Sequence, residues 1–227
     1  MAATSGHDGF FVALEGIDGS GKTSVAIALA NFLRSQHGHR VVLTREPGGT
    51  AIGEQIRDVI LRAHDMRPET EVLLFAAARA QHVAEVIAPA LRRGDVVISD
   101  RFVDSSLAYQ WGGRGLPFDA VRDAQGLALH GLAPDLKILL DLPVDRALRR
   151  RLAEVGSANR LDLETVQFHE RVRTAYHQLA AATPTEWRIV DASGGPEQVA
   201  AAVIDAVLEF MRSQSKQSAP RVPEIAG

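Results

Sequence analysis

Glycines, a lysine and hydroxyl side chains are concentrated near the start of the chain, in the stretch ALEGIDGSGKTS at residues 13–24. Gly16, Gly21, Lys22 and Thr23 match the phosphate-binding loop pattern of glycine, four residues, then glycine, lysine and serine or threonine. In such a loop backbone N–H groups surround phosphate oxygens, the lysine reaches the β and γ phosphates, and the threonine hydroxyl binds Mg²⁺. A glycine-rich surface turn would not need the apolar run before it and the alanine-rich helix after it. The residues expected to bind the phosphates of a nucleoside triphosphate are Gly16, Ile17, Asp18, Gly19, Ser20, Gly21, Lys22, Thr23 and Ser24.

A second candidate for phosphate chemistry closes the apolar stretch VVISDRF with Asp100 and Arg101. Side chains at the carboxyl ends of parallel strands line the ligand site of a doubly wound sheet. The Asp100 carboxylate could hold Mg²⁺ or its waters, and the Arg101 guanidinium could fork onto a phosphate. A salt bridge at a strand end is the alternative explanation for this pair.

A third candidate is the pair Phe75 and Arg79 in the stretch FAAARAQH. Residues four apart lie on one face of a helix, and the alanines between them leave space above the backbone. An aromatic ring beside a planar cation could stack on a base and bind its edge. An amphipathic core helix with an arginine extending to solvent explains the same letters equally well.

These groups need a scaffold, and the apolar pattern predicts one. Short runs rich in valine, isoleucine and leucine suit strands that are buried on both faces. The expected strands are 10–14, 41–44, 96–99, 136–142 and 188–190, and the expected helices are 23–35, 70–92, 119–130, 144–154, 164–182 and 197–211. This alternation predicts an α/β fold with a doubly wound sheet of about five parallel strands, flanked by helices.

Composition favours a soluble domain and excludes several kinds of site. The 227 residues carry 46% hydrophobic and 23% charged residues, a formal net charge of −3 and no cysteine. Disulfides and thiol nucleophiles are therefore excluded, and no overall positive charge favours nucleic acid. No apolar run or signal-like start indicates a membrane or export, so we expect a cytoplasmic protein. One domain is expected at 10–212, between a flexible N-terminus at 1–9 and a disordered tail at 213–227.

Two other classes of site are not favoured. A GTPase switch needs an Asn-Lys-x-Asp segment to read guanine, but the only asparagines are Asn31 and Asn159, outside such a segment. His82, His130 and His169 lack the spacing of zinc ligands.

Five segments, in order and spacing, resemble the bacterial type of thymidylate kinase. They are EGIDGSGKTS, TREPGGT, LLFAAARAQH, DRFVDSSLAYQWGGRG and NRLDLETVQFHERVRTAYHQLA. The resemblance extends from about Phe10 to Met211. It implies a nucleoside monophosphate kinase fold, a homodimer, ATP with Mg²⁺ as donor, and dTMP as the acceptor that becomes dTDP.

The resemblance also implies roles for residues of the acceptor site. Phe75 would stack on thymine, and Arg79 and Ser106 would lie at the base. Tyr109 would crowd the 2′ position of the sugar, and Asp18 would contact its 3′-OH and the surroundings of the metal. The acceptor phosphate would be taken by Arg45 and Arg101. Gln110 and Glu46 are weaker candidates, because each could equally be structural. 

A lid at about 149–162 is expected to supply a catalytic arginine. Some relatives carry an arginine inside the phosphate-binding loop, but this chain has Gly19 there. The segment RALRRRLAEVGSANRLD resembles the lid of relatives whose catalytic arginine lies in the lid instead. Consecutive helical residues diverge by about 100°, so Arg149, Arg150 and Arg151 cannot all face the site. We favour Arg150 and Arg160, and a solvated basic face is the alternative.

The combined prediction is direct phosphoryl transfer from ATP with Mg²⁺ to dTMP. The expected catalytic residues are Lys22, Arg101, Asp18, Arg150 and Arg160, and the expected metal residues are Thr23 and Asp100. Two alternatives stay open at this point. One is a kinase for another nucleotide or a deoxynucleoside, and the other is a regulatory ATPase with no acceptor.

Overall fold

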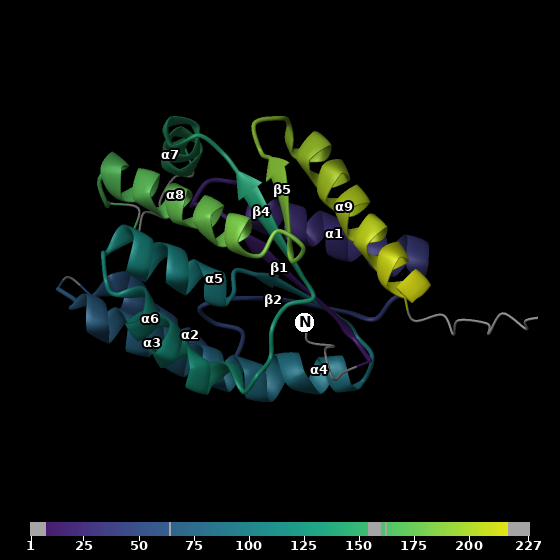
Figure 1. Ribbon diagram of the computed structural model, residues 1–227, viewed down its shortest axis with the longest axis horizontal. Helices are drawn as coiled ribbons and strands as arrows, with labels where there is room; N and C mark the ends of the chain where they lie inside the picture. Colours follow the sequence, from purple (N-terminus) through teal and green to yellow (C-terminus); the bar gives the residue numbers. More distant parts are fainter. Residues whose placement is uncertain (1–7, 64, 154–159, 162, 218–227) are drawn as a thin grey trace, which may run out of the picture.

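The computed structural model describes residues 8–63, 65–153, 160–161 and 163–217, which form an open parallel sheet flanked by helices (Figure 1). The five strands of the sheet stand in the order β2-β3-β1-β4-β5. They are β1 (Phe10–Glu15), β2 (Val41–Arg45), β3 (Val96–Asp100), β4 (Leu136–Asp141) and β5 (Trp187–Asp191). Every pairing is parallel, which confirms the predicted fold class. The chain builds outward from β1 to one side and then to the other, so the ligand site of such a sheet lies at the carboxyl end of β1.

The helices connect the strands and cover the sheet. They are α1 (Lys22–His37), α2 (Ala51–Arg62), α3 (Pro68–His82), the π-helical turn η1 (Val83–Ile87), α4 (Ala88–Arg92), α5 (Val103–Ser106), the π-helical segment η2 (Leu107–Gly113), α6 (Phe118–Leu129), α7 (Val144–Ala153), α8 (Val166–Ala182) and α9 (Pro196–Gln217). Helix α1 packs against α9, α8 packs against η2, and α3 contacts both α2 and α6 (Figure 1). Helices α2, α3 and α6 thus pack together as one group.

Strand β1 shows why its sequence is apolar without alternation. Phe11 and Ala13 belong to the apolar cluster that includes Leu91 of α4. Val12 and Leu14 belong to the cluster that includes residues of α1 and α9. These four side chains are fully buried, so both faces of the strand are covered. Strand β1 is thereby held firmly behind the phosphate-binding loop.

The strands and the six predicted helices are all present, with ends that shift by a few residues. Two helical segments were not predicted. Helix α2 is amphipathic but buries only Gly53 and Ile60 completely, and its start depends on Thr50, whose side chain accepts a hydrogen bond from the N–H of Gly53. The short α5 and η2 contain small residues, and η2 ends in two glycines. Their sequence therefore shows no clear helical periodicity.

The predicted helix 70–92 is divided into α3, η1 and α4. Pro89 has no N–H to donate to the carbonyl four residues earlier, and just before it the N–H of Ala88 bonds the carbonyl of Val83. The helical stretch Pro68–Arg92 is long and apolar enough to span a bilayer by length and composition. This stretch instead has the features of an interior helix. It packs against α2 and α6, and it buries polar residues of its own.

The two chain ends differ from the prediction. Helix α9 continues to Gln217, so the expected boundary of the tail near 213 is wrong by several residues. At the other end, Gly9 is packed rather than loose, because its N–H donates to the Leu91 carbonyl at 3.0 Å. The rest of both predicted segments, 1–7 and 218–227, lies outside the described residues.

Candidate active site

The loop between β1 and α1 has a shape that requires glycine at two positions. Gly16 has φ +138°, and a Cβ there would meet the Leu140 carbonyl oxygen at 2.7 Å. Gly19 has φ +80°, and a Cβ there would meet the Ala147 carbonyl oxygen at 2.2 Å. The loop thus packs on the backbones of β4 and α7, which leaves no room for an arginine at position 19. Helix α1 begins after Gly21 without a side-chain cap, so its first N–H groups point to where an anion can bind.

Lys22 lies against this loop and is 6% exposed. Its Nζ donates to the Ile17 carbonyl at 2.9 Å and to Ser20 Oγ at 3.3 Å. Burial, together with the charge of Arg101, lowers the pKa of Lys22 to about 8. A triphosphate placed beside Nζ would supply the opposite charge that favours the protonated form.

Thr23 and Asp100, the two predicted metal residues, meet at the carboxyl edge of the sheet. Thr23 Oγ1 donates to Asp100 Oδ2 at 2.6 Å. A hydroxyl and a carboxylate are oxygen ligands of the kind that Mg²⁺ uses in nucleotide-dependent enzymes, where phosphates and waters fill the other positions. Among the described residues no group of three or more acidic or histidine side chains forms an all-protein metal site. The two oxygen ligands fit a Mg²⁺ ion whose remaining ligands come from a triphosphate and from water.

The guanidinium of Arg101 lies between the phosphate-binding loop and a neighbouring pocket. It is 14% exposed and forms an ion pair with Asp18 at 2.7 Å. It also donates to the Gly16 carbonyl at 2.9 Å, to Ser105 Oγ at 3.0 Å and to Tyr109 Oη at 3.2 Å. These bonds fix a permanent positive charge at the junction of the two sites.

Asp18 and Tyr109 complete this unit. Tyr109 Oη donates to Asp18 Oδ2 at 2.8 Å, and its ring lies 5.1 Å from the Arg101 guanidinium. Burial alone would raise the pKa of Asp18, but the charges of Arg101 and Lys22 hold it well below its usual range. Asp18 is therefore a carboxylate, able only to accept hydrogen bonds.

The backbone of Arg101 is held in an unusual conformation, with φ +74°. Its N–H donates to the Leu14 carbonyl at 2.9 Å, and its carbonyl accepts from Ser99 Oγ at 2.7 Å. The next N–H, that of Phe102, donates to Glu15 Oε1 at 2.9 Å. Strands β1 and β3 thus clamp this turn from both sides, and the clamp offsets the strain of the left-handed conformation.

Glu15 is a residue of the site that the sequence analysis missed. It is fully buried, and Oε2 accepts from Ser105 Oγ at 2.6 Å and from Tyr176 Oη at 3.0 Å. Burial, reinforced by the charge of Asp104, raises the pKa of Glu15 to about 7. The sequence did carry a signal for Glu15, because it is an acidic residue at the end of a buried strand, directly before the phosphate-binding loop.

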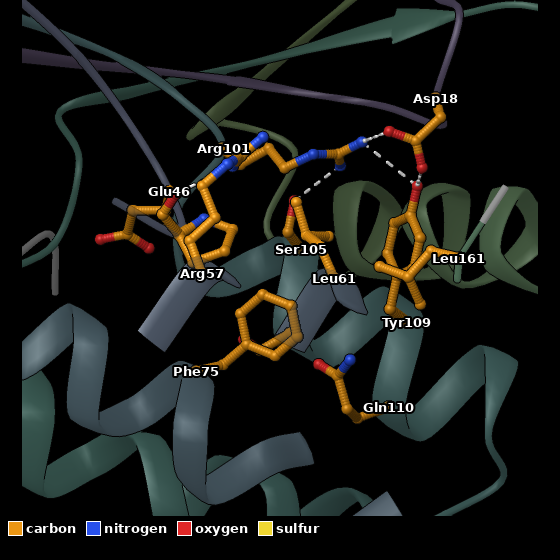
Figure 2. A pocket seen from close by; sticks show the side chains of 12 residues that line it. Asp18, Glu46, Arg57, Leu61, Phe75, Arg101, Ser105, Tyr109, Gln110 and Leu161 are labelled. Atoms are coloured by element: carbon orange, nitrogen blue, oxygen red, sulfur yellow. Dashed lines mark hydrogen bonds and ion pairs between the residues drawn. The ribbon is translucent and has the colours of Figure 1, made fainter. Parts of the chain in front are cut away.

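Beside Arg101 opens a pocket of about 490 Å³, part of it open to solvent (Figure 2). Phe75 forms one end of it, and Asp18 and Arg101 form the other. The residues that line it are Asp18, Glu46, Pro47, Arg57, Leu61, Phe75, Arg101, Ser105, Ser106, Tyr109, Gln110 and Leu161. The structure therefore brings together six of the eight predicted acceptor residues, all but Arg45 and Arg79.

Arg45 does not line the pocket, and Arg57 of α2 does. Arg45 forms an ion pair with Glu54 at 2.9 Å and is 54% exposed. Arg57 donates to the Pro47 carbonyl at 2.9 Å, and burial beside the Arg45 charge lowers the pKa of its guanidinium. The sequence analysis missed Arg57 because it missed α2, although an amphipathic helix after Thr50 would have signalled it.

Arg79 lies beneath the pocket rather than in its wall. It is 1% exposed, and its donors reach Glu46 Oε2 at 2.8 Å, the Phe102 carbonyl at 3.0 Å, Ser106 Oγ at 3.2 Å and Gln125 Oε1. A buried guanidinium must satisfy its N–H groups, and protein oxygens do so here. The alternative of an arginine extending to solvent is therefore wrong, whereas its place at the edge of a base stays a prediction.

Glu46, whose role the sequence left open, is a buried bridge that also touches the pocket. Besides Arg79, it contacts His82 Nδ1 at 2.9 Å, and His82 Nε2 lies 2.6 Å from Thr44 Oγ1. A Cβ on Gly49 would meet Thr44 Oγ1 at 2.7 Å, so the loop after β2 folds tightly over this network. His82 thus links Glu46 to Thr44 beneath this loop.

The favoured lid arginines point elsewhere in this structure. Arg150 donates to two backbone carbonyls of the loop after β5, at 3.0 and 3.2 Å. Arg160 donates to Glu71 and to the backbone of α2. Neither is among the residues that line the pocket. The remainder of the predicted lid, 154–159 and 162, lies outside the described residues.

A parallel sheet with a phosphate-binding loop, and with a second pocket that meets it at Arg101, defines the class of P-loop nucleotide kinases. Residues 14–203 match the family described as thymidylate kinase. This chain is 50% identical over 203 residues to the thymidylate kinase of Thermomicrobium roseum, covering 89% of this chain and 96% of that relative. It is 52% identical over 186 residues to that of Desulforudis audaxviator, covering 81% and 83%. The chain belongs to the thymidylate kinase family.

A solved structure supports the same assignment at the level of the fold. The crystal structure of thymidylate kinase from Ehrlichia chaffeensis superposes with a TM-score of 0.74 at 30% sequence identity. The alignment covers 88% of this chain and 98% of that one.

Replacing Arg101 by alanine is expected to lower kcat/KM at least about a hundredfold, because the site would lose the cation that several oxygens are arranged to hold. Steady-state kinetics with each substrate varied would measure this. Arg149→Ala serves as the matched control, since Arg149 is 72% exposed and forms an ion pair with neighbouring Asp145 on α7. Equal activity of the two variants would contradict the role of Arg101.

Binding of ATP near pH 8.5 is expected to take up more than about half a proton, because Lys22 is then largely neutral in the free protein and charged beside the phosphates. Affinity for ATP should accordingly fall as the pH rises through about 8. Calorimetry in two buffers of different ionisation enthalpy measures the uptake. Lys22→Arg, which stays charged, should bind ATP without this uptake.

Glu15→Gln is expected to change how stability depends on pH. Since the folded pKa of Glu15 is raised from its usual value to about 7, its favourable contribution is full below the unfolded pKa and lost as the pH rises through 7. From pH 5 to pH 8, the free energy of unfolding measured with urea should fall in the wild type relative to the variant, by on the order of 3 kcal/mol. Parallel pH profiles would show that Glu15 titrates normally.

Proposed function

We propose that this protein transfers the γ-phosphoryl group of ATP to dTMP, giving dTDP and ADP, a step of dTTP synthesis. The pocket next to the phosphate-binding loop carries the proposal. At one end it offers the ring of Phe75 to a base, and at the other the guanidinium groups of Arg57 and Arg101 to a phosphate. A nucleotide bound in this direction has its phosphate close to the triphosphate of a donor bound by Lys22.

The base would stack on Phe75, with Ser106 and Gln110 beside it in the pocket wall. Arg79 lies one layer deeper and steadies Ser106. To contact a base itself, Arg79 would have to give up one of its present hydrogen bonds. The hydrogen bond to Ser106, at 3.2 Å, is the longest of these.

The sugar would lie along Tyr109, whose ring is held by Asp18 and Arg101. A ring fixed by its hydroxyl group has no freedom to retreat from an added 2′-OH, so this contact favours deoxyribose. The Asp18 carboxylate can accept a hydrogen bond from the 3′-OH.

Transfer would take place directly between the two nucleotides. A phosphate oxygen of dTMP forms the bond to Pγ, while the bond from Pγ to the β–γ bridging oxygen breaks and its electron pair leaves with ADP. The acceptor phosphate is already ionised at neutral pH, so no general base is required. Mg²⁺ held by Thr23 and Asp100 would neutralise charge on the phosphate oxygens.

The cations of the chain offset the repulsion between the two anions. Unit charges 4 Å apart repel by about 4 kcal/mol at an effective dielectric constant near 20. Lys22 acts on the donor, Arg57 on the acceptor, and Arg101 on both. A further cation from the lid requires Arg150 or Arg160 to leave its present partners.

We also propose that the protein is a cytoplasmic homodimer. The helical layer of α2, α3 and α6 exposes large apolar side chains: Val59 is 51%, Leu73 is 62% and Leu127 is 82% exposed. Apolar side chains gathered on neighbouring helices favour burial against a second copy.

The decisive test is an acceptor panel with ATP, Mg²⁺ and purified protein. We expect dTMP to be converted to dTDP with a kcat/KM at least about tenfold above dUMP, UMP and dCMP, measured by chromatography of the nucleotides. Faster turnover of another nucleotide would identify a different kinase. Loss of ATP without a phosphorylated acceptor would identify an ATPase.

A further inference from the structure

Glu71, in the first turns of α3, is a fully buried acid that no role in the reaction accounts for. Its Oε1 accepts from Gln110 Nε2 at 2.7 Å. Its Oε2 accepts from Arg114 Nη2 at 3.2 Å and from Arg160 Nη2. Arg114 in turn pairs with Glu164. One carboxylate thus joins the wall of the acceptor pocket to two arginines behind it.

These two arginines keep Glu71 ionised. Burial alone would raise the pKa of this carboxyl group, but the charge of Arg114 and the hydrogen bonds from Gln110 and Arg160 hold it below its usual range. An ionised carboxylate has only acceptor atoms. Glu71 can therefore contact the amide nitrogen of Gln110 but not its oxygen.

This restriction decides which atom Gln110 presents to a ligand. Gln110 is fully buried, and its Oε1 has no hydrogen-bond partner among the residues that the structure describes. The side chain lines the acceptor pocket, and its oxygen is on the side of the Phe75 ring (Figure 2). A buried acceptor without a partner favours a ligand that brings a donor to it.

We propose that Glu71 is a specificity-determining positioning residue, which orients the Gln110 amide so that the pocket selects a pyrimidine with a donor at N3. Thymine and uracil carry N–H at N3, whereas cytosine has a lone pair there. A lone pair facing Oε1 would leave two buried acceptors opposed, which disfavours a cytosine nucleotide. This inference rests on the proposed function, because it assumes that the pocket binds the base of the acceptor.

Glu71→Gln tests the proposal, since an amide at position 71 can donate to Gln110 Oε1 and so allows either orientation of Gln110. The readout is the ratio of kcat/KM for dTMP to that for dCMP. We expect this ratio to fall roughly tenfold to a hundredfold, the effect of one buried polar mismatch. A residue with a purely structural role would lower both values together and leave the ratio unchanged.

Glu164→Gln is the matched control. It also removes a carboxylate from Arg114, but among the described residues no hydrogen bond joins Glu164 to Gln110, so the kcat/KM ratio of this variant should equal that of the wild type. If Glu71→Gln does not fold, Glu71→Asp keeps the charge beside both arginines while its shorter side chain withdraws from Gln110. For this variant too, the ratio of kcat/KM for dTMP to that for dCMP should fall. The preference for dTMP over dCMP in dissociation constants measured by calorimetry should fall with it.

The outcomes separate this proposal from the one on which it rests. If the wild type does not phosphorylate dTMP, the proposed function fails. If the wild type prefers dTMP and a folded Glu71 variant keeps the wild-type ratio, the role of Glu71 alone is overturned. A ratio that falls equally in Glu164→Gln would also overturn it, because the cause would then be loss of charge around Arg114.

Discussion

Arg101 brings a permanent positive charge into a region largely withdrawn from water, and the residues around it keep that charge in one place. Asp18 neutralises it, while Ser105, Tyr109 and the Gly16 carbonyl accept its other hydrogen bonds. A buried guanidinium without such partners would be costly, and one with them is rigid. The distance between the phosphate-binding loop and the acceptor pocket is therefore set by a single side chain that bonds to both.

The parallel sheet makes this arrangement possible. Strands β1 and β3 are neighbours, so their carboxyl ends bring the phosphate-binding loop and the Asp100–Arg101 turn side by side. Glu15 at the end of β1 accepts the N–H that follows Arg101, and Ser99 of β3 donates to the Arg101 carbonyl. The strained backbone of Arg101 persists because two strands that are fixed by the core define it from both sides.

Two buried carboxylates organise the acceptor pocket from behind in the same manner. Glu46 bridges Arg79 and His82 under the loop that follows β2, and Glu71 bridges Arg114 and Arg160 behind Gln110. Buried ion pairs contribute little net stability, since desolvation offsets much of their attraction. What they add here is direction, because each fixes the side chains that form the pocket wall.

The sequence by itself determined the strands, most helices and the phosphate-binding loop. These features depend on local spacing and on periodic burial, which the order of residues encodes directly. Only the tertiary structure decided which arginine serves which site. Arg45 is drawn to Glu54, Arg79 to Gln125 and Arg150 to the loop after β5, and each partner lies nine or more residues away. A long, charged side chain reaches several alternative partners, so its final direction depends on which distant oxygens the fold places within reach.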